Sequence, residues 1–348
     1  MSRFLIYGAN GYTGRLVAAE ALRQGLQPLL AGRNRAELEA MGKALRLDWR
    51  VFDLSDAATL RREFDGLPLV LNCAGPFSAT ALPVLETCLA TRSHYLDITG
   101  EIDVFALCHR HHDVARERGI VVLPGTGFDV VPTDCVAAML KQRQPDATHL
   151  TLAFEAGGGP SPGTARTSVE GLAKGGRARI AGELVEVPLA WKSRTFLRDG
   201  KPRTAMTIPW GDVYTAYVST GIPNIETYMT VPPATIRRVR RLRFLRPLLG
   251  LKPVQSWLKR RAGARPGPSA EGRDRSDCRI WGEVRNARGN EVRLELSTPN
   301  GYALTATASV GIVRRLLADA APGGFHTPSQ LMGAEYVLSL PDTRLTGA

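Results

Sequence analysis

Short apolar runs alternate with segments of helical periodicity along the first 130 residues of the chain. The run Phe4–Tyr7 leads into a glycine-rich turn, and the residues after that turn place apolar side chains at helical spacing as far as Gly25. Further strands are predicted at residues 28–31, 49–54, 69–77, 94–101 and 120–132, with helices at 81–92 and 103–119. Such alternation predicts a Rossmann-type, doubly wound parallel sheet, which binds its ligand at the carboxyl ends of the strands.

After Pro132 the pattern changes to strands that follow one another. Strands are predicted at residues 149–156, 203–210, 212–220 and 225–231, a hairpin at 278–298 and a long helix at 301–320. We therefore expect a second, mixed α+β domain with a largely antiparallel sheet, and a substrate bound in the cleft between the domains. The expected ranges are 1–132 for the Rossmann domain, 133–320 for the substrate domain with a basic insertion at about 234–275, and 321–348 for a C-terminal segment.

The C-terminal segment carries one helix signal. Thr327 suits a helix cap, and Pro328 suits the first turn that follows it. We expect this segment to pack back on the Rossmann domain.

The turn after the first strand reads GANGYTG. In a dinucleotide-binding turn, Gly8 would allow the tight bend, Gly11 would let backbone amides approach a pyrophosphate, and Gly14 would let the helix pack close to the strand. The phosphates then lie at the positive end of the helix dipole. The spacing G-x-x-G-x-x-G is a variant of the commoner G-x-G-x-x-G, and it is the flanking strand and helix that favour dinucleotide binding over an ordinary glycine turn.

The second strand is followed by Gly32 and Arg33, about 20 residues after the glycines. An NAD site usually has an acid at this place, whereas an NADP site needs positive charge for the 2′-phosphate. Gly32 leaves space, and Arg33 can offer a forked guanidinium to phosphate oxygens, assisted by Asn34 and Arg35. These residues predict NADP(H) as the cofactor. The alternative is that the arginines only cover the start of a helix.

Two further strand ends belong to the expected cofactor site. Asp53 follows the third strand near the adenine, and the loop Asn72–Phe77 follows the fourth strand and runs towards the nicotinamide. The expected cofactor-binding residues are Gly8, Asn10, Gly11, Tyr12, Thr13, Gly14, Gly32, Arg33, Asn34, Asp53, Asn72, Ala74, Gly75 and Pro76.

Four motifs at the strand ends resemble one family of oxidoreductases. YGANGYTG, NCAGPF, YLDITGE and GTGFDVVPTD together resemble the saccharopine dehydrogenase-like proteins, and more narrowly the bacterial branch that includes trans-acting enoyl reductases. The resemblance covers the first 140 residues and extends more loosely into GTARTSVEGLAKGG, TIPWGDV, STGIPNIETYM and GFHTPSQLMGAEY. It implies an NADP-binding Rossmann domain joined to a mixed α/β substrate domain. Members reduce imines or enoyl groups, so the resemblance implies no single substrate.

Candidate catalytic residues lie where the fifth and sixth strands end. A phenol or carboxyl group at Tyr95, Asp97 or Glu101 can donate or relay a proton as hydride is delivered, and Asp129 is a similar candidate. The rival interpretation is that these groups hydrogen-bond the turns. No tyrosine is followed by lysine four residues later, which disfavours the Y-x-x-x-K chemistry of short-chain dehydrogenases.

The cysteines and histidines favour structural roles. The five cysteines are scattered and contain no C-x-x-C pair, which argues against a zinc site or a disulfide framework. Cys73 and Cys135 are better explained by packing than as nucleophiles. His109, His111 and His112 share one predicted helix without suitably spaced partners, so a solvated face is favoured over metal binding. We expect no metal site.

The formal net charge of +12 is concentrated in one segment, because residues 227–270 contain eleven Lys or Arg and no acid. Apolar residues among these arginines suit an amphipathic helix, broken by Pro247 and Gly250. Residues 236–261 could contact an anionic membrane surface or an acyl-carrier protein, cover an apolar substrate as a lid, or form a solvated insertion. The segment has few aromatic residues and no recognised binding module, so we expect no nucleic-acid partner.

A glycine- and proline-rich stretch at residues 155–172 leads to a helix predicted to begin at Thr164. The helix start could bind a substrate carboxylate or phosphate, and a plain loop is the equal alternative.

No apolar run approaches the roughly 20 residues that span a bilayer, and no leader is apparent, so we expect a cytoplasmic protein. A peripheral place at the inner membrane face is the alternative. We predict an NADP(H)-dependent oxidoreductase that transfers hydride to or from a C=N or C=C group of a small-molecule or acyl substrate. The alternatives are a trans-acting enoyl reductase for lipid or polyketide chains and a non-catalytic, NADP-binding protein at a membrane. A homodimer is compatible with each of them.

Overall fold

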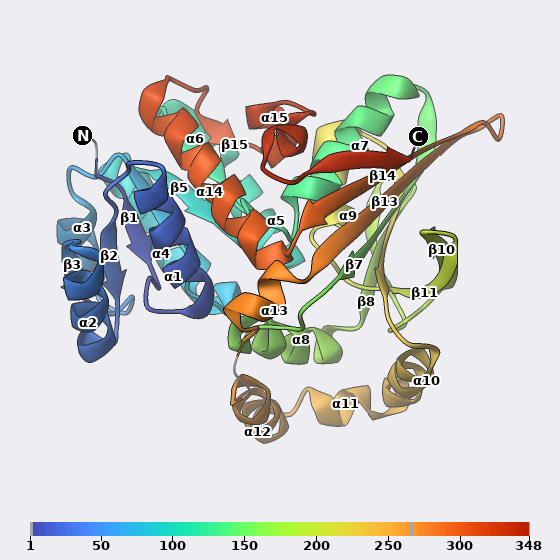
Figure 1. Ribbon diagram of the computed structural model, residues 1–348, viewed down its shortest axis with the longest axis horizontal. Helices are drawn as coiled ribbons and strands as arrows, with labels where there is room; N and C mark the ends of the chain where they lie inside the picture. Colours follow the sequence, from blue (N-terminus) through green and yellow to red (C-terminus); the bar gives the residue numbers. More distant parts are fainter. Residues whose placement is uncertain (1–2, 265–266, 348) are drawn as a thin grey trace. The chain divides into compact units, whose positions relative to one another are not determined.

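The computed structural model describes residues 3–264 and 267–347, which form two compact units. Unit 1 comprises Met1–Asp129 and Tyr302–Met332, and unit 2 comprises Val130–Gly301 and Gly333–Ala348. Each unit is built around a β-sheet of its own, and Figure 1 shows the two sheets with their helices.

In the part of the chain that the structure describes, the sheet of unit 1 has seven strands in the order β15-β6-β5-β4-β1-β2-β3, and all its pairings are parallel. The strands are β1 (Leu5–Tyr7), β2 (Leu29–Gly32), β3 (Trp49–Val51), β4 (Leu69–Asn72), β5 (His94–Asp97), β6 (Val121–Leu123) and β15 (Gly324–Phe325). Because β1 lies between β2 and β4, the strand order reverses there, as it does where Rossmann folds bind their ligands. The predicted Rossmann-type sheet is confirmed.

Side chains cap several helices of unit 1. These helices are α1 (Tyr12–Arg23), α2 (Arg35–Leu45), α3 (Ala57–Phe64), α4 (Phe77–Thr91), α5 (Ile102–Arg110), α6 (His112–Glu117), α14 (Gly301–Ala318, grouped with unit 1 from Tyr302) and α15 (Pro328–Met332). The Asn34 side chain accepts a hydrogen bond from the Glu37 amide at 3.3 Å, and Asp56 caps α3 in a similar way. The single helix predicted at 103–119 is divided into α5 and α6 at His111.

Unit 2 contains a mixed, mostly antiparallel sheet. Its strands are β7 (Ala147–Ala156), β8 (Gly176–Ile180), β9 (Glu183–Val187), β10 (Ser193–Arg198), β11 (Lys201–Thr207), β12 (Asn224–Thr230), β13 (Asp277–Asn286), β14 (Glu291–Pro299) and β16 (Arg344–Gly347). The main order is β10-β11-β12-β7-β13-β14-β16, with β8 and β9 beside β12, and the β12–β7 pairing is parallel. The predicted mixed α+β unit is confirmed.

The helices of unit 2 include the basic segment. They are α7 (Val131–Arg143), α8 (Pro162–Lys174), α9 (Asp212–Thr220), α10 (Pro233–Leu242), the 3₁₀ turn η1 (Arg243–Leu245), α11 (Arg246–Leu249), α12 (Lys252–Gly263), α13 (Ala270–Asp274) and the 3₁₀ turn η2 (Tyr336–Ser339). The basic segment is therefore helical, as predicted, and it is interrupted near Gly250, which lies between α11 and α12. The break predicted at Pro247 is wrong, because this residue lies within α11.

One predicted strand of unit 2 is a helix. Residues 212–220 form α9, although valine, tyrosine and threonine favour strands. The buried side chains follow helical spacing and belong to Asp212, Val213, Thr215, Ala216 and Thr220. Since α9 packs on α7, tertiary packing overrides the local preference for strand.

The predicted start of α8 at Thr164 is wrong by two residues. Ser161 caps the helix by accepting the Thr164 amide at 3.2 Å, and Pro162 occupies the first helical position. The amide that was predicted to face an anion therefore bonds within the chain.

The C-terminal third of the chain is grouped differently from the expected ranges. Within unit 1, the Thr305 hydroxyl of α14 accepts the Phe128 amide at 2.9 Å, and the Ser309 hydroxyl lies 3.0 Å from that of Thr126. These bonds tie α14 to the turn after β6. Residues 333–348 instead belong to unit 2, where β16 pairs with β14.

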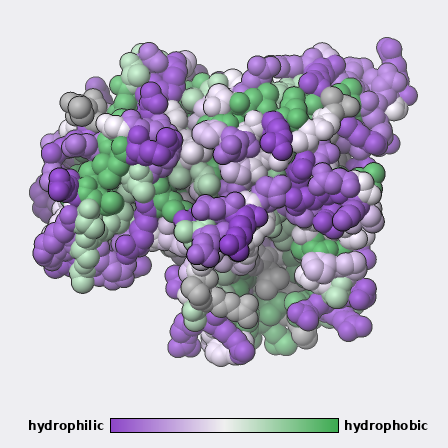
Figure 2. Space-filling model, viewed as in Figure 1, coloured by the Kyte–Doolittle hydropathy of each residue, from purple (hydrophilic) through white to green (hydrophobic). Residues whose placement is uncertain are grey.

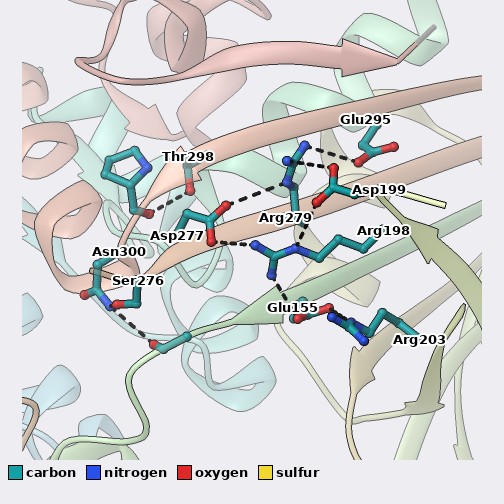
Figure 3. Close-up of polar contacts among 12 residues, drawn as sticks. Glu155, Arg198, Asp199, Arg203, Ser276, Asp277, Arg279, Glu295, Thr298 and Asn300 are labelled. Carbon is teal, nitrogen blue, oxygen red and sulfur yellow. Dashed lines mark hydrogen bonds and ion pairs between the residues drawn. The ribbon is translucent and has the colours of Figure 1, made fainter. Parts of the chain in front are cut away.

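Charged side chains fix the β10–β11 hairpin to the rest of the sheet of unit 2 (Figure 3). Arg198 on β10 pairs with Glu155 of β7 at 2.9 Å and with Asp277 of β13 at 2.5 Å. Asp199, in the turn of the hairpin, pairs with Arg279 of β13 at 3.3 Å. The hairpin is thus held by ion pairs to two strands that are distant from it in the sequence.

Candidate functional site

Three glycines bring β1 and α1 of unit 1 into close contact. Gly8 has a φ of +79°, and a Cβ at this position would lie 2.8 Å from the backbone nitrogen of Ala74. A Cβ on Gly14 would lie 2.3 Å from the Gly8 carbonyl oxygen, and one on Gly11 would lie 3.1 Å from the same atom. The turn therefore has no room for side chains at Gly8 and Gly14, and its backbone passes directly to the N-terminus of α1.

The loop after β4 is organised by the buried side chain of Asn72. Its Oδ1 accepts the Ala74 amide at 3.0 Å, and its Nδ2 donates to the Thr80 hydroxyl at 3.1 Å. Thr80 in turn donates to the Ala74 carbonyl oxygen at 2.6 Å. Gly75 and Pro76 lead from this loop into α4. The predicted cofactor loop is thus pinned by its own side chains against the glycine turn.

The exposed Arg33 lies where β2 ends, and its charge acts on the ends of β1 and β3. Burial raises the pKa of Tyr7 to about 12, and the charge of Arg33 opposes this rise. Hydrogen bonds from Ser55 hold the pKa of Asp53 below its usual range, and Arg33 adds to that effect. Arg33 therefore supplies positive charge at the strand ends where the 2′-phosphate is predicted.

Glu37 is an acid in this region that the sequence analysis did not single out. Its Oε2 accepts from Arg15 Nη2 at 3.0 Å and from Asn10 Nδ2 at 3.2 Å, and its Oε1 accepts from Asn34 Nδ2 at 2.7 Å. Glu37 thus holds two of the predicted cofactor-binding residues. The signal was present, because an N-cap residue followed three positions later by Glu is the pattern of a capping box.

The remaining predicted residues of this region have neighbours within unit 1. A Cβ on Gly32 would lie 2.8 Å from the Asn10 side-chain oxygen, so a larger residue here would require the Asn10 side chain to move. Tyr12 opens α1 with its ring edge-on to Tyr302, at 4.9 Å between centroids, and Thr13 follows it. The guanidinium carbon of Arg35 lies 5.7 Å from the centroid of the Trp49 ring.

Tyr95 and Asp97 form a fully buried pair at the end of β5. The Tyr95 hydroxyl donates to Asp97 Oδ2 at 2.6 Å, and Asp97 Oδ1 accepts the amides of Thr99 and Gly125, both at 2.9 Å. Burial raises the pKa of Asp97 to about 6, and these hydrogen bonds oppose the rise. Through these hydrogen bonds the pair connects the turn after β5 to the turn after β6. Because both side chains are fully buried, they are better suited to positioning these turns than to contacting a substrate.

Glu101 and Asp129 lie on those two turns. Glu101 accepts the amides of Phe77 and Ser78, both at 2.9 Å, so its carboxylate stabilises the start of α4. Asp129 packs against Gly100, where a Cβ would lie 3.1 Å from the Asp129 Oδ2. Burial, and then the negative charge of Glu101, raise the pKa of Asp129 to about 7. The half-buried Asp129 therefore combines partial solvent access with a pKa near neutrality.

Comparison with known proteins assigns most of unit 1. Residues 4–123 match the family model of the saccharopine dehydrogenase NADP binding domain. This part of the chain is similar to a saccharopine dehydrogenase NADP-binding domain. The match contains the glycine turn, the end of β2 and the Asn72 loop, so the predicted family resemblance is confirmed for the range that carries the cofactor residues.

The NADP-binding domain has relatives in animals, plants and bacteria. A saccharopine dehydrogenase-like oxidoreductase of Rattus norvegicus is 29% identical over 152 residues, which cover 38% of this chain and 35% of the relative. A probable mitochondrial saccharopine dehydrogenase-like oxidoreductase of Arabidopsis thaliana is 34% identical over 152 residues, covering 37% and 32%. A trans-acting enoyl reductase of Mycobacterium leprae is 32% identical over 150 residues, covering 40% and 35%. Each match spans about a third of the relative's own length.

The fold of the whole chain is similar to that of one solved dehydrogenase. Apo saccharopine dehydrogenase (L-Glu forming) from Saccharomyces cerevisiae superimposes with a TM-score of 0.66, covers 100% of both chains and is 10% identical. At this identity the likeness shows the fold alone. The similarity in fold covers both units of the chain.

NADP(H) is the cofactor of the NADP-binding domain, and the residues present fit it. A Cβ on Gly8 or Gly14 would fill the space beside the first turn of α1, whose amides suit a diphosphate. Arg33 would bring positive charge for the 2′-phosphate, and the nearby acid Glu37 is paired with Arg15 at 3.0 Å. A bound NADPH would supply a hydride to the substrate.

Histidines and cysteines have structural roles in unit 1. His112 Nδ1 accepts the amide of Phe325 at 3.1 Å, and the ring of His109 stacks on that of Phe325 at 4.6 Å. These two histidines therefore hold β15 and do not form the predicted solvated face. Burial raises the pKa of the Cys73 thiol, which suits a packing role. Among the residues that the structure describes, no group of His, Cys, Asp and Glu could hold a metal ion.

Proposed function

We propose that the chain is an NADP(H)-dependent oxidoreductase that transfers hydride between the cofactor and a C=N or C=C group. The observation that carries the proposal is Asp129, whose carboxyl group has a pKa of about 7 and lies on the turn after β6, just beyond residues 4–123, which match the NADP-binding domain. Enzymes that catalyse such reductions use proton donors whose pKa lies near the pH at which the enzyme works.

Different residues of the chain have different roles in this reaction. A bound NADPH would supply a hydride to one atom of the double bond and would be left as NADP⁺, and the other atom would take up a proton to give the amine or the saturated product. Asp129 holds that proton at its carboxyl group and becomes the carboxylate. Tyr95 and Asp97 position the turn that carries Asp129. Burial keeps the pKa of Asp129 high, and the negative charge of Glu101 adds to this effect.

A reduction of enoyl groups on acyl chains is the second candidate. It is supported by the similarity to the Mycobacterium leprae protein named trans-acting enoyl reductase. It is also supported by apolar side chains that lie exposed among the arginines of α10 to α12, since an acyl substrate would be met at a membrane or on a carrier. A substrate screen should therefore test two classes of compound, imines and enoyl thioesters, for NADPH-dependent reduction.

Arg33→Ala is expected to raise the Kd for NADPH by about ten- to a hundredfold and to leave the Kd for NADH unchanged. The lost hydrogen bonds to the charged 2′-phosphate are worth about 1.5–3 kcal/mol. Fluorescence titration of wild type and variant with each cofactor measures both constants. Arg35→Ala is the matched control, because Arg35 lies over Trp49. An unchanged preference for NADPH in Arg33→Ala would contradict the assignment, and cofactor binding without turnover in the substrate screen would favour the non-catalytic alternative.

We also propose that α10 to α12 form a membrane-docking surface, which would place the protein at the inner face of a membrane. Large apolar side chains are exposed in this segment: Phe244 87%, Leu248 56%, Leu251 51% and Trp257 52%. They stand in a stretch with eleven basic and no acidic residues, which suits anionic lipid headgroups. Figure 2 shows hydrophobic residues over α11, between hydrophilic ones over α10 and α12. None of the described helices is long and apolar enough to cross a bilayer.

Phe244→Glu combined with Trp257→Glu is expected to weaken binding to vesicles of phosphatidylglycerol and phosphatidylcholine at least tenfold. Each exposed aromatic would bury its ring in the interface, at about 1.5–3 kcal/mol for full burial. Co-sedimentation measures the bound fraction. Leu197→Glu is the matched control, because Leu197 is 61% exposed but lies on β10. Equal binding of the double variant and wild type would exclude membrane docking. Point variants are preferable to deletion, because Arg243 donates to the carbonyls of Leu189 and Ala190.

A further inference from the structure

Unit 2 contains a cavity of about 750 Å³ that none of the features above uses. This volume is within the range that holds small-molecule ligands. The cavity lies over the first residues of β7 and β12 and is also lined from β8, β10, β13 and α10. Its basic lining residues are Arg179, Lys192, Arg194, Arg240 and Arg285.

The carboxylates of the cavity are already paired. Glu226 forms an ion pair with Lys192, and Glu283 pairs with Arg194 at 2.9 Å. The third acid, Glu291, pairs at 2.9 Å with Arg293. None of these ion pairs includes the other three cavity arginines, Arg179, Arg240 and Arg285.

Arg179 is the most enclosed of these three, with 6% of its surface exposed. Its Nε donates to the Val213 carbonyl oxygen at 2.8 Å, and its Nη1 donates to that of Gly182 at 2.7 Å. The Tyr217 ring lies 4.1 Å below the guanidinium carbon. Burial lowers the pKa of Arg179. Two carbonyls and a ring thus fix the guanidinium, and among the described residues no carboxylate lies within ion-pair distance of it.

Arg240 and Arg285 bring two more positive charges to the same cavity. Arg240 donates to the Ala190 carbonyl oxygen at 3.1 Å and to the Ser193 hydroxyl at 3.3 Å. Arg285 is exposed, and in the described ranges neither residue has an acidic partner within 4.0 Å. At His149, beside them, burial lowers the pKa and the charge of Arg285 lowers it further. The cavity wall is therefore cationic around a buried arginine.

We propose that this cavity binds a small anionic metabolite that carries a phosphate or carboxylate group. Arg179 is nearly buried and, within the described part of the chain, contacts no carboxylate directly, although the charge of Glu183 acts on it from a distance. An oxyanion that reaches its guanidinium would form short, charge-assisted hydrogen bonds. Arg179 is held by carbonyls that a ligand does not displace, so its fork is fixed before the ligand arrives. Arg240 and Arg285 add charge at the wall, and Trp191 gives one lining surface for the rest of the ligand.

Calorimetric titration of the full chain with inorganic phosphate and, separately, with citrate tests the site and distinguishes the two anion classes. Saturating NADP⁺ is added so that the phosphate sites of the NADP-binding domain are filled. Saturable binding of one anion or both is expected, with a Kd at least tenfold higher in Arg285→Gln and in Arg179→Gln. Arg288→Gln is the matched control, because Arg288 is exposed in the turn between β13, which carries Arg285, and β14, and it does not line the cavity.

The result that overturns the proposal is the absence of saturable binding, or binding that Arg240→Gln and Arg285→Gln leave unchanged. These two variants keep the test valid if Arg179→Gln does not fold. NADPH affinity is measured in each variant, and it is expected to be unchanged, so failure here is distinguishable from failure of the cofactor assignment. If sedimentation shows that Arg285→Gln instead dissociates a dimer, the cavity is occupied by a second copy of the chain and the metabolite proposal is wrong.

Discussion

NADPH binding is expected to fall about a hundredfold or more in the Gly14→Val protein. A Cβ at Gly14 would lie 2.3 Å from the carbonyl oxygen of Gly8 and 2.8 Å from the Cα of Ala9. Both are backbone atoms, which cannot rotate away as a side chain can. The start of α1 must therefore move from the glycine turn, and its amides leave the place where they meet the diphosphate. Fluorescence titration with NADPH measures the loss.

Gly163→Val is the matched control for this prediction. Gly163 also lies in the first turn of a helix, α8, but the nearest atom to its Cβ would be 3.7 Å away. Its NADPH affinity should equal that of wild type. Thermal unfolding followed by circular dichroism separates loss of the site from loss of the fold, and the smaller change Gly14→Ala serves if the valine protein unfolds. A Gly14→Val protein that binds NADPH as tightly as wild type would refute the close-contact explanation.

The architecture of unit 1 could be predicted from the sequence because each strand is short, apolar and followed by a turn or helix signal. Local pattern is sufficient for such βα units. It was insufficient for residues 212–220, whose β-branched and aromatic residues favour strand in isolation but which pack on α7 as a helix. It was also insufficient to group α14, because long-range contacts such as the hydrogen bonds of Thr305 and Ser309 to the turn after β6 show where this helix belongs.

The candidate site was predictable in its glycines and strand ends but not in its polar contacts. A glycine that is required by a close backbone approach can be recognised in the sequence by its position after a strand. The end of a strand can be recognised in the same way, from the turn or helix signal that follows it. The bonds of Glu37 to Asn10, Arg15 and Asn34 join residues up to 27 positions apart, and no periodicity reports such a contact. Likewise, Glu101 was a candidate acid by its position, and only the structure shows that it caps α4.

Asp129→Asn is expected to lower the rate of substrate reduction about a hundredfold at pH 7. The asparagine keeps the shape of the side chain but has no proton to give. In the wild type, Asp129 is protonated below its pKa of about 7, so the rate should fall as the pH rises through that value. In the variant this limb of the pH profile should be absent. Initial rates with the substrate found in the screen, measured from pH 5 to pH 9, check both points.

Asp113→Asn is the control for the loss of one carboxylate. Asp113 belongs to the same unit, and its exposed side chain pairs with Arg116 on the surface of α6. Its pH profile should match that of wild type. An Asp129→Asn protein that retains the falling limb near pH 7 would show that another group donates the proton.

Asp129→Asn should also stabilise the folded protein, and more so at pH 8 than at pH 5. Burial and the charge of Glu101 raise the folded-state pKa of Asp129 from its usual 3.8 to about 7. As the pH rises between these values, the unfolded chain loses this proton and the folded chain keeps it, so the wild type becomes progressively less stable until both states are ionised. The full shift corresponds to at most about 4 kcal/mol, which partial solvent access reduces. Asparagine carries no such penalty, so the gain in melting temperature over wild type should grow from pH 5 to pH 8. A gain that is equal at both values would mean that Asp129 is already ionised in the folded protein and cannot hold the proton that the reduction requires.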